Sequence, residues 1–483
     1  MPMASILAWL PRFALAFVCT ALTLEARPNI VLAIADDWGW PHASAYGDKG
    51  VKTPTFDRLA REGVLLEHAY ISSPSCTPSR GAIITGQQFW RLGPAGNLWS
   101  VWQSAHPEYP RLLAGEGYFV GSYRKGWGPG THPKSAVSPA GKIYRSVEAF
   151  FEARPDGMPF CLWFGASDPH RPYKKGTGVE SGVRLEDVHL FEHYPDVEEI
   201  RSDVADYYFE VQRFDSDVGR LLEVLESLGE LDDTLIVMTG DHGMPFPRGK
   251  GNLYDSGARV PMAIRWAASV PGGRTVTDFV STTDLAPTFL AAAGLDVPPA
   301  MTGRSLVEIL TSGQSGRVSK DRDHVLFGRE RHVVAQDAPD MGGYPARGIR
   351  TDKYLYIRNY AADRWPAGTP HYKQAQATNA WLADCDNGPT KWFLWENRSD
   401  PAVKGYYDLA FAKRPAEELY DLEKDPGQVR NVSANSKYAQ VRKELSVRLA
   451  QALIETQDPR IEGRGSLFDS QPYLGGSPSF PTR

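Results

Sequence analysis

Three apolar runs, at residues 30–35, 159–166 and 235–239, constrain the fold of this chain more than any other feature. Runs without polar alternation are typical of strands buried on both faces, as in parallel sheets covered by helices. Residues 204–228, between the second and third runs, carry apolar side chains at helical spacing. Strands that alternate with helices predict an α/β fold. Shorter helices are predicted at residues 55–63, 79–85 and 284–293.

The chain changes character after about residue 320. Short strands with charged turns are predicted at residues 324–327, 346–350, 353–358 and 419–426. An amphipathic helix is predicted at residues 438–456. Residues 361–404, rich in Trp, Asn, Asp and Gly, are predicted to be an irregular insertion of the kind that often serves binding. The length of 483 residues fits a larger domain at 27–320 and a smaller α+β domain at 321–483.

The N-terminal segment differs from the rest. Residues 13–24 form an uncharged apolar stretch preceded by Arg12, and the following Glu25-Ala26 fits a cleavage site. We therefore predict a signal peptide at residues 1–26 and a secreted or periplasmic protein, or a lysosomal one if the source is eukaryotic. A single membrane anchor is the alternative, but the run is short, so no stable membrane insertion is expected.

The charge of the chain limits its partners. The formal net charge of -5, without a basic tail or a run of Lys and Arg, argues against a nucleic-acid partner. A polyanionic substrate stays open, because a local basic pocket can form on an acidic protein. The sequence also leaves the oligomeric state open and allows a homodimer.

Acidic and histidine residues follow each apolar run. They are Asp36, Asp37, Asp168, His170, Asp241 and His242. Ligands gather at the carboxyl ends of strands in α/β sheets, and adjacent carboxylates repel unless a cation lies between them. The oxygen-rich set of Asp36, Asp37 and Asp241 suits a hard cation such as Ca²⁺ or Mg²⁺. One such pair alone would more often be a helix cap or a turn, but three pairs with the same placement favour a site.

Cysteine usage singles out one residue. Removing the predicted signal peptide leaves three of the four cysteines, which is no disulfide framework. Cys161 lies in an apolar run and is predicted to be a small buried residue. Cys76 instead lies in the polar segment SCTPSRG at residues 75–81. A cysteine in a polar segment of an exported protein suggests a chemical role.

The segment at residues 75–81, followed by Thr85 and Gly86, resembles the signature of the type I sulfatases, Cys-x-Pro-Ser-Arg with a later Thr-Gly pair. The resemblance covers nearly the whole chain after the N-terminal segment. It extends over residues 28–38, 53–60, 240–243, 248–254 and 418–426. Within the family, the likeness is strongest to the N-sulfoglucosamine sulfohydrolases, or heparan N-sulfatases. That likeness rests on residues 244–247, 252–254, 344–347 and 455–459.

The resemblance implies an alkaline-phosphatase-like mixed sheet sandwiched by helices, with a catalytic domain at 27–320 and a C-terminal α+β domain that contributes to the substrate pocket. It implies that a formylglycine-generating or sulfatase-maturing enzyme converts Cys76 to formylglycine, whose hydrated aldehyde attacks sulfur. The implied ligands of Ca²⁺, or alternatively Mg²⁺, are Asp36, Asp37, Cys76, Asp241 and His242. Alternatively, His242 lies beside the ligands and does not itself bind the cation.

The resemblance also implies roles for charged residues around Cys76. Arg80 would hold the formylglycine, and Lys125 and Lys250 would neutralise sulfate oxygens. His170 would protonate the leaving atom, and His332 would line a sugar subsite. Each role has an alternative. Arg80 could lie on a helix surface, and Lys125 and Lys250 could be solvated loop lysines. His170 could pack in a loop, and His332 could belong to a solvated charged turn.

Trp127 departs from the family pattern. Sulfatases commonly carry Gly-Lys-x-His, and here Lys125 matches the lysine whereas Trp127 stands in the place of the histidine. In the family that histidine helps the sulfated intermediate to release sulfate, so this step has no assigned residue. His132 is near in sequence, but nothing in the sequence gives it the role.

The favoured function is removal of sulfate from a sulfated saccharide, either an N-sulfoglucosamine-type sulfamate or a polysaccharide O-sulfate. A phosphoesterase or phosphonate hydrolase of the same fold is one alternative. A non-catalytic glycan-binding relative, in which Cys76 stays unmodified, is the other. Aromatic residues between Trp381 and Trp395 could supply sugar-stacking faces, although buried aromatics are the commoner arrangement.

Overall fold

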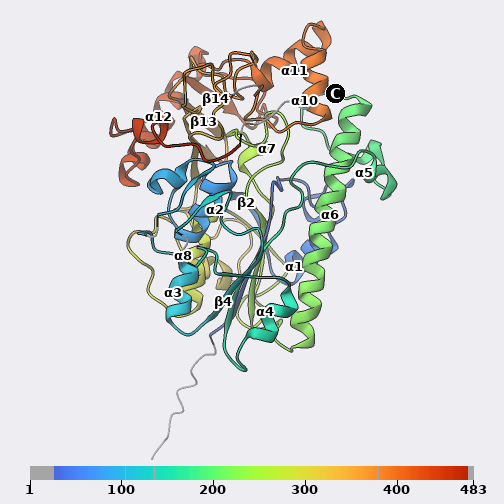
Figure 1. The fold of residues 1–483 in the computed structure, drawn as a ribbon, viewed down its shortest axis with the longest axis vertical. Helices are drawn as coiled ribbons and strands as arrows, with labels where there is room; N and C mark the ends of the chain where they lie inside the picture. Colours follow the sequence, from blue (N-terminus) through green and yellow to red (C-terminus); the bar gives the residue numbers. More distant parts are fainter. Residues whose placement is uncertain (1–26, 104, 134–136, 372, 378–379, 477–483) are drawn as a thin grey trace, which may run out of the picture.

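The computed structural model describes residues 27–103, 105–133, 137–371, 373–377 and 380–476 (Figure 1). The predicted signal peptide therefore lies outside the described residues. The strands of a central sheet are β1 (Asn29–Ala35), β2 (Val64–Tyr70), β4 (Phe119–Arg124), β6 (Lys142–Tyr144), β7 (Phe160–Gly165), β8 (Thr234–Gly240), β9 (Met262–Arg265) and β10 (Arg274–Ser281). Their order is β10-β2-β9-β8-β1-β7-β4-β6. Strand β9 is antiparallel to both neighbours and the other pairs are parallel, which confirms the expected mixed sheet.

The three apolar runs form adjacent strands in the middle of this sheet. Strand β1 pairs in parallel with β7 on one side and β8 on the other, so Ile30 lies opposite both Cys161 and Leu235. Every residue of β7 and β8 is buried, as predicted for strands covered on both faces. The carboxyl ends of the three strands meet, and the N–H of Asp36 donates to the carbonyl of Asp168 (3.0 Å).

Helices cover both faces of the sheet (Figure 1). Alternate residues of β1, beginning with Ile30 and Val31, belong to two separate apolar cores. One core includes residues of α2 (Cys76–Thr85), α3 (Tyr109–Gly115) and α8 (Leu285–Ala292), and the other includes residues of α1 (Pro54–Glu62), α4 (Val147–Ala153) and α6 (Glu198–Ser227). Shorter helices are α5 (Thr177–Glu180), α7 (Asp255–Ala258), α9 (Val307–Thr311) and α13 (Ser466–Asp469). Of the helices in the described part of the chain, none combines the length and apolar character needed to cross a bilayer.

Two helices begin earlier than their patterns predict. Helix α6 begins at Glu198 and not at residue 204, and acidic residues in its first turn suit the positive end of the helix dipole. Helix α2 begins at Cys76 and not at residue 79, and all ten of its residues are buried. Gly86 ends α2 with a φ of 62°, the left-handed conformation that glycine adopts readily. Cys76 is therefore the first residue of a buried helix.

A second, antiparallel sheet forms the C-terminal part, in the order β11-β12-β13-β14. Its strands are β11 (His324–Arg329), β12 (Ala346–Thr351), β13 (Tyr354–Asn359) and β14 (Glu417–Asp421). Helix α12 (Ala439–Glu455) buries Leu445, Leu449 and Leu453 in the core that also contains Ile349. This confirms the predicted α+β character, whereas the boundary at residue 320 stays a prediction. A short two-stranded sheet pairs β3 (Ser100–Val101) with β5 (Gly130–Thr131).

Residues 361–404 were expected to be irregular, and this is wrong for their second half. They contain α10 (Pro389–Glu396) and the start of α11 (Pro401–Phe411). Both helices have proline in the first turn, where its missing N–H costs nothing. The carboxylate of Asp400 accepts a hydrogen bond from the N–H of Ala402 at the start of α11.

A buried ion-pair network joins the second sheet to the segment after α12. Arg347 on β12 donates to Asp458 Oδ2 (2.7 Å) and to Glu330 Oε1 (2.8 Å), and none of the three side chains is more than 1% exposed. Arg460 is a second partner of Glu330. Burying these charges is tolerable only because they are paired.

We predict that Arg347→Met lowers the free energy of unfolding by about 3–5 kcal/mol, because Asp458 would stay buried without its partner. Arg184→Met is the matched control, since Arg184 pairs with Asp187 at the surface and such pairs contribute about 0–1 kcal/mol. Thermal and urea unfolding, followed by circular dichroism, would measure both variants. Equal losses would contradict the prediction.

Candidate active site

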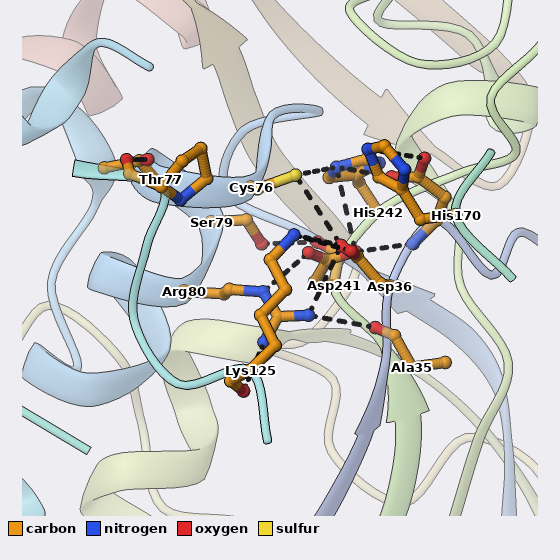
Figure 2. A network of polar contacts seen from close by, with 12 residues as sticks. Ala35, Asp36, Cys76, Thr77, Ser79, Arg80, Lys125, His170, Asp241 and His242 are labelled. Carbon is orange, nitrogen blue, oxygen red and sulfur yellow. Dashed lines mark hydrogen bonds and ion pairs between the residues drawn. The ribbon is translucent and has the colours of Figure 1, made fainter. Parts of the chain in front are cut away.

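The strand ends meet around Cys76 (Figure 2). From the start of α2, the side chain of Cys76 points toward residues that follow β1 and β8. Its Sγ atom lies 3.3 Å from His242 Nε2 and 3.7 Å from Asp36 Oδ1. The residue is only 3% exposed. The structure thus brings together the five residues predicted to bind a metal, Asp36, Asp37, Cys76, Asp241 and His242.

The thiol of Cys76 is not poised to react as it stands. Burial raises its pKa well above the usual range, and the nearby ammonium groups of Lys125 and Lys250 do not offset that effect. A cysteine nucleophile has to be ionised. The raised pKa therefore disfavours the thiolate form of Cys76 in this environment.

Two sets of ligand atoms surround Cys76 Sγ. Asp37 and His242 complete one set, Asp36 and Asp241 the other, and the atoms of each set lie within 4.8 Å of one another. Asp37 Oδ1 is buried without a hydrogen-bond partner, although His242 Nε2 is 3.2 Å away. A buried, unpartnered carboxylate oxygen is costly, and carboxylates are preferred ligands of hard cations. The donor set fits Ca²⁺ or Mg²⁺.

A tight turn makes the first ligand pair possible. Successive side chains of a strand point to opposite faces, so two adjacent aspartates reach one site only if the chain leaves the extended conformation. Asp37 has a φ of 73°, which residues other than glycine rarely adopt. Its N–H donates to Asp241 Oδ1 (2.9 Å) and holds the turn.

Arg80 is fully buried, so the alternative of a helix-surface arginine is wrong. Its Nε donates to Asp241 Oδ2 (2.7 Å), and its Nη1 donates to the carbonyl of Gly126 (3.0 Å). These hydrogen bonds fix Asp241 in the site. The contact between Arg80 and a formylglycine stays a prediction.

Lys125 and Lys250 each pair with a carboxylate, so the alternative of two solvated loop lysines is wrong. Lys125 Nζ is 2.6 Å from Asp36 Oδ1, and Lys250 Nζ is 2.9 Å from Asp37 Oδ2. Burial alone would raise the pKa of Asp36, but Lys125 and Arg80 outweigh it and hold that pKa well below the ordinary value. Burial likewise would lower the pKa of each lysine, but the carboxylates raise it above the ordinary value.

His170 lies at the open side of the site. Its side chain is 36% exposed, and its Nε2 is 3.8 Å from Asp37 Oδ2. Its Nδ1 is 2.6 Å from the carbonyl oxygen of Arg171, which assigns the hydrogen to Nδ1 and leaves Nε2 facing the site. Asp168 instead pairs with Arg213 (3.3 Å); it lines the cavity beside His170 but belongs to none of the groups of ligand atoms.

His332 is buried, so the alternative of a solvated charged turn is wrong. Its Nδ1 is 2.8 Å from Ser75 Oγ, directly before Cys76. Burial and the ammonium of Lys250 hold its pKa well below the ordinary value, so the ring is neutral. Its observed polar contact supports the loop before α2, and a role in a sugar subsite stays a prediction.

Asp386 is a site residue that the sequence did not indicate. It comes from the segment before α10, and its Oδ2 lies 3.1 Å from Lys250 Nζ. Together with Asp37 and His170 it forms a further group of ligand atoms within 4.8 Å of one another. Burial would raise the pKa of Asp386, but Lys250 and His170 lower it. Asp386 lies in the stretch 361–404, which was predicted to be an insertion of the kind that often serves binding, but no motif singles out this residue.

The tryptophans between Trp381 and Trp395, for which burial was the commoner of the two expected arrangements, pack mainly against one another. Trp381 is 3% exposed. Its ring lies 5.3 Å from that of Trp392 and 4.6 Å from that of Trp395, between centroids. These rings build the small core beside α10 and α11. Burial, the commoner arrangement of aromatic side chains, is therefore the one observed.

Trp127 does not stand in for the missing histidine. It is 3% exposed and packs edge-on against Trp102, with 5.2 Å between ring centroids. His132 lines a different cavity, together with Trp102 and Glu108. Neither residue belongs to the groups of ligand atoms around Cys76.

A cavity of about 580 Å³ opens over the site. Its lining includes Asp36, Trp99, Lys125, His170 and Arg171. Ligand pockets in proteins commonly span about 300–1,000 Å³. The cavity therefore has room for a ligand that reaches Asp36 and Lys125 from solvent.

We predict that Asp37→Asn weakens Ca²⁺ binding more than about tenfold, because it removes charge from the ligand set. Asp168→Asn is the matched control: it makes the same change at a neighbouring strand end, outside the set, and should leave the affinity unchanged. Isothermal titration calorimetry on the unmodified protein measures this without turnover. Equal affinities in the two variants would refute the assignment.

Comparison with known sequences identifies the family. The model of the sulfatase family matches residues 28–141 and 141–295, more than half of the chain. A second model, N-sulphoglucosamine sulphohydrolase, C-terminal, matches residues 240–367. N-sulphoglucosamine sulphohydrolase of Homo sapiens is 28% identical over 92% of this chain and 94% of its own length. An ulvan-active sulfatase of Formosa agariphila is 25% identical over 88% of this chain and 75% of its own length.

Solved structures share the fold. A protein in complex with its substrate D-glucosamine-2-N,6-O-disulfate has a TM-score of 0.65 at 20% identity, covering 89% of this chain and 98% of its own. The phosphonate monoester hydrolase of Agrobacterium radiobacter has a TM-score of 0.63 at 18% identity, covering 90% and 97%. These likenesses confirm the expected architecture. On the match of the family model, this chain belongs to the sulfatase family of hydrolases.

Proposed function

We propose that this protein is a formylglycine-dependent sulfatase that removes sulfate from a sulfated saccharide, with an N-sulfoglucosamine-type sulfamate as the favoured bond. The observation that carries the proposal is the setting of Cys76, a buried thiol with a raised pKa between carboxylates and two lysines. Such a setting, with carboxylates that can hold a cation and lysines that can bind anionic oxygens, suits attack on an anionic group by the side chain at position 76.

The choice of saccharide and bond is supported by the relatives. The match of the N-sulphoglucosamine sulphohydrolase model and the human enzyme of that name both favour a sulfamate. The similar structure with D-glucosamine-2-N,6-O-disulfate also holds an N-sulfated sugar. The similarity to an ulvan-active sulfatase supports a polysaccharide O-sulfate as the second candidate for the bond that is cleaved.

Formylglycine at position 76 would supply a hydroxyl nucleophile that needs no thiol ionisation. A formylglycine-generating or sulfatase-maturing enzyme is the partner that this requires. The apolar run at residues 13–24 supports a secreted, periplasmic or lysosomal location. Within the site, Arg80 positions Asp241 beside residue 76 through the 2.7 Å hydrogen bond from its Nε.

Asp36, Asp37, Asp241 and His242, with the modified Cys76, would hold the divalent cation, Ca²⁺ or Mg²⁺. When bound, the cation supplies positive charge that favours an ionised hydroxyl and a developing anion. Lys125 lines the cavity and, with the deeper Lys250, would bind sulfate oxygens.

His170 would deliver a proton to the leaving nitrogen or oxygen. Because Nδ1 is engaged by the carbonyl of Arg171, Nε2 is the nitrogen that exchanges protons with a ligand in the cavity. Asp386 lies beside it and would accept a hydrogen bond from the sugar or from its released amine.

One alternative has an observation in its favour. The phosphonate monoester hydrolase of Agrobacterium radiobacter shares the fold over nearly its whole length. A phosphonate or phosphate ester presents similar anionic oxygens to the two lysines. Parallel assays on sulfate and phosphate esters therefore accompany the test of the proposal.

We predict that the mature protein releases sulfate from N-sulfated glucosamine saccharides and that Cys76→Ala abolishes this, because the nucleophile is lost. Cys161→Ala, which changes a buried cysteine on β7, is the control and keeps the activity. Ion chromatography measures sulfate over a panel of N- and O-sulfated saccharides. Peptide mass spectrometry shows whether Cys76 has become an aldehyde. Phosphate release without sulfate release, or a fully active Cys76→Ala variant, would overturn the proposal.

We predict that His170→Ala lowers kcat on a saccharide sulfamate or sulfate by about 100-fold or more, because a general acid contributes about 10²–10⁴. The loss should be much smaller on an aryl sulfate, whose phenolate leaves without a proton. His132→Ala removes a histidine outside the site and serves as the control. Steady-state kinetics with both substrate types would check this. An equal loss on both types would exclude His170 as the proton donor.

A further inference from the structure

Trp99 is the one large aromatic side chain among the residues that line the cavity over Cys76. It is 36% exposed, unlike the tryptophans beside α10. The same cavity is lined by Asp36, Lys125 and His170. An aromatic face and the groups around Cys76 are therefore within reach of a single ligand.

The backbone of Trp99 is in an unfavourable conformation. Its φ is 53°, in the left-handed region that bulky residues avoid. Both neighbours are fixed: the N–H of Leu98 donates to the carbonyl of Arg331 (3.1 Å), and Ser100 pairs with Gly130 between β3 and β5. Leu98 is buried in a cluster with Cys76. At this turn Leu98 is buried beside Cys76, and the next residue, Trp99, lines the cavity.

The C-terminal tail holds Trp99 in place. The N–H of Leu474 donates to the carbonyl of Trp99 (3.0 Å). A Cβ on Gly475 would lie 2.7 Å from the indole Cδ1 and Cγ atoms, so the tail backbone packs directly against the ring. Arg331 anchors the tail by donating to the carbonyls of Gln471 (2.8 Å) and Pro472 (3.0 Å).

We propose that Trp99, held by tail residues 472–476, is the stacking platform for the sugar ring that carries the sulfate, and thus a specificity-determining residue. This rests on the proposed function, because it takes a sulfated saccharide as the ligand. With the sulfate at Lys125, the adjoining ring lies along the cavity wall that Trp99 supplies. The indole offers an apolar face to the C–H groups of a sugar, and a rigid aromatic loses little entropy on binding.

The first test compares Trp99→Ala and Trp99→Phe with the parent on an N-sulfated glucosamine disaccharide. Trp99→Ala should raise KM about five- to tenfold with kcat unchanged, because it removes binding shared by ground and transition states. Trp99→Phe should restore most of the affinity. Inhibition by inorganic sulfate, which lacks a sugar ring, should be the same in all three proteins. Val447→Ala, an exposed apolar change on α12, is the control.

The second test concerns the tail. A chain that ends at Pro472 and a Gly475→Val variant should both raise KM as Trp99→Ala does, whereas a chain that ends at Gly476 should not. In a Cys76→Ala background, direct titration of the disaccharide gives the same comparison without turnover. If the parent releases sulfate but Trp99→Ala binds and turns over the disaccharide normally, the inference alone is overturned. If the parent neither releases sulfate from any saccharide nor binds one, the proposed function falls as well.

Discussion

Repulsion between buried carboxylates is the constraint on which the site depends. Three aspartates converge where β1 and β8 end, and each pairs with a cationic side chain; Arg80 also lies 3.5 Å from Asp36, and Lys250 also pairs with Asp386. The pairs are Asp36 with Lys125, Asp37 with Lys250 and Asp241 with Arg80. An unpaired buried charge costs several kcal/mol. The three aspartates follow the strands, whereas the cationic side chains come from α2 and two loops, so each aspartate has its partner only when all these segments are in place.

The central sheet was predictable because its signal is local. Strands covered on both faces read as nearly continuous apolar runs, and the runs at β1, β7 and β8 proved to be adjacent. The residues at their ends follow from parallel pairing, which places Asp36 and Asp241 together. Helix boundaries were less accurate: α2 begins at Cys76 because its first turn is buried by the tertiary structure, which no periodicity in the segment records.

Residues supplied by distant segments were not predictable. Asp386 enters the site from a stretch without a motif, and Trp99 owes its position to a strained turn and to the C-terminal tail. The aromatic stretch around Trp381 allowed either sugar stacking or burial, and it fills a small core in which the rings pack against one another. Composition identifies the aromatic residues, but only packing decides which of them a ligand can reach.

The burial of α2 has a consequence for the order of events in the life of this protein. Cys76 and the nine residues after it have almost no contact with solvent, and Arg80 is locked to Asp241 beneath them. A maturation enzyme has to reach the side chain of Cys76, and in the folded chain all ten residues of α2 are buried. On the proposed function, the burial of α2 therefore favours oxidation of Cys76 before the sheet closes over this helix.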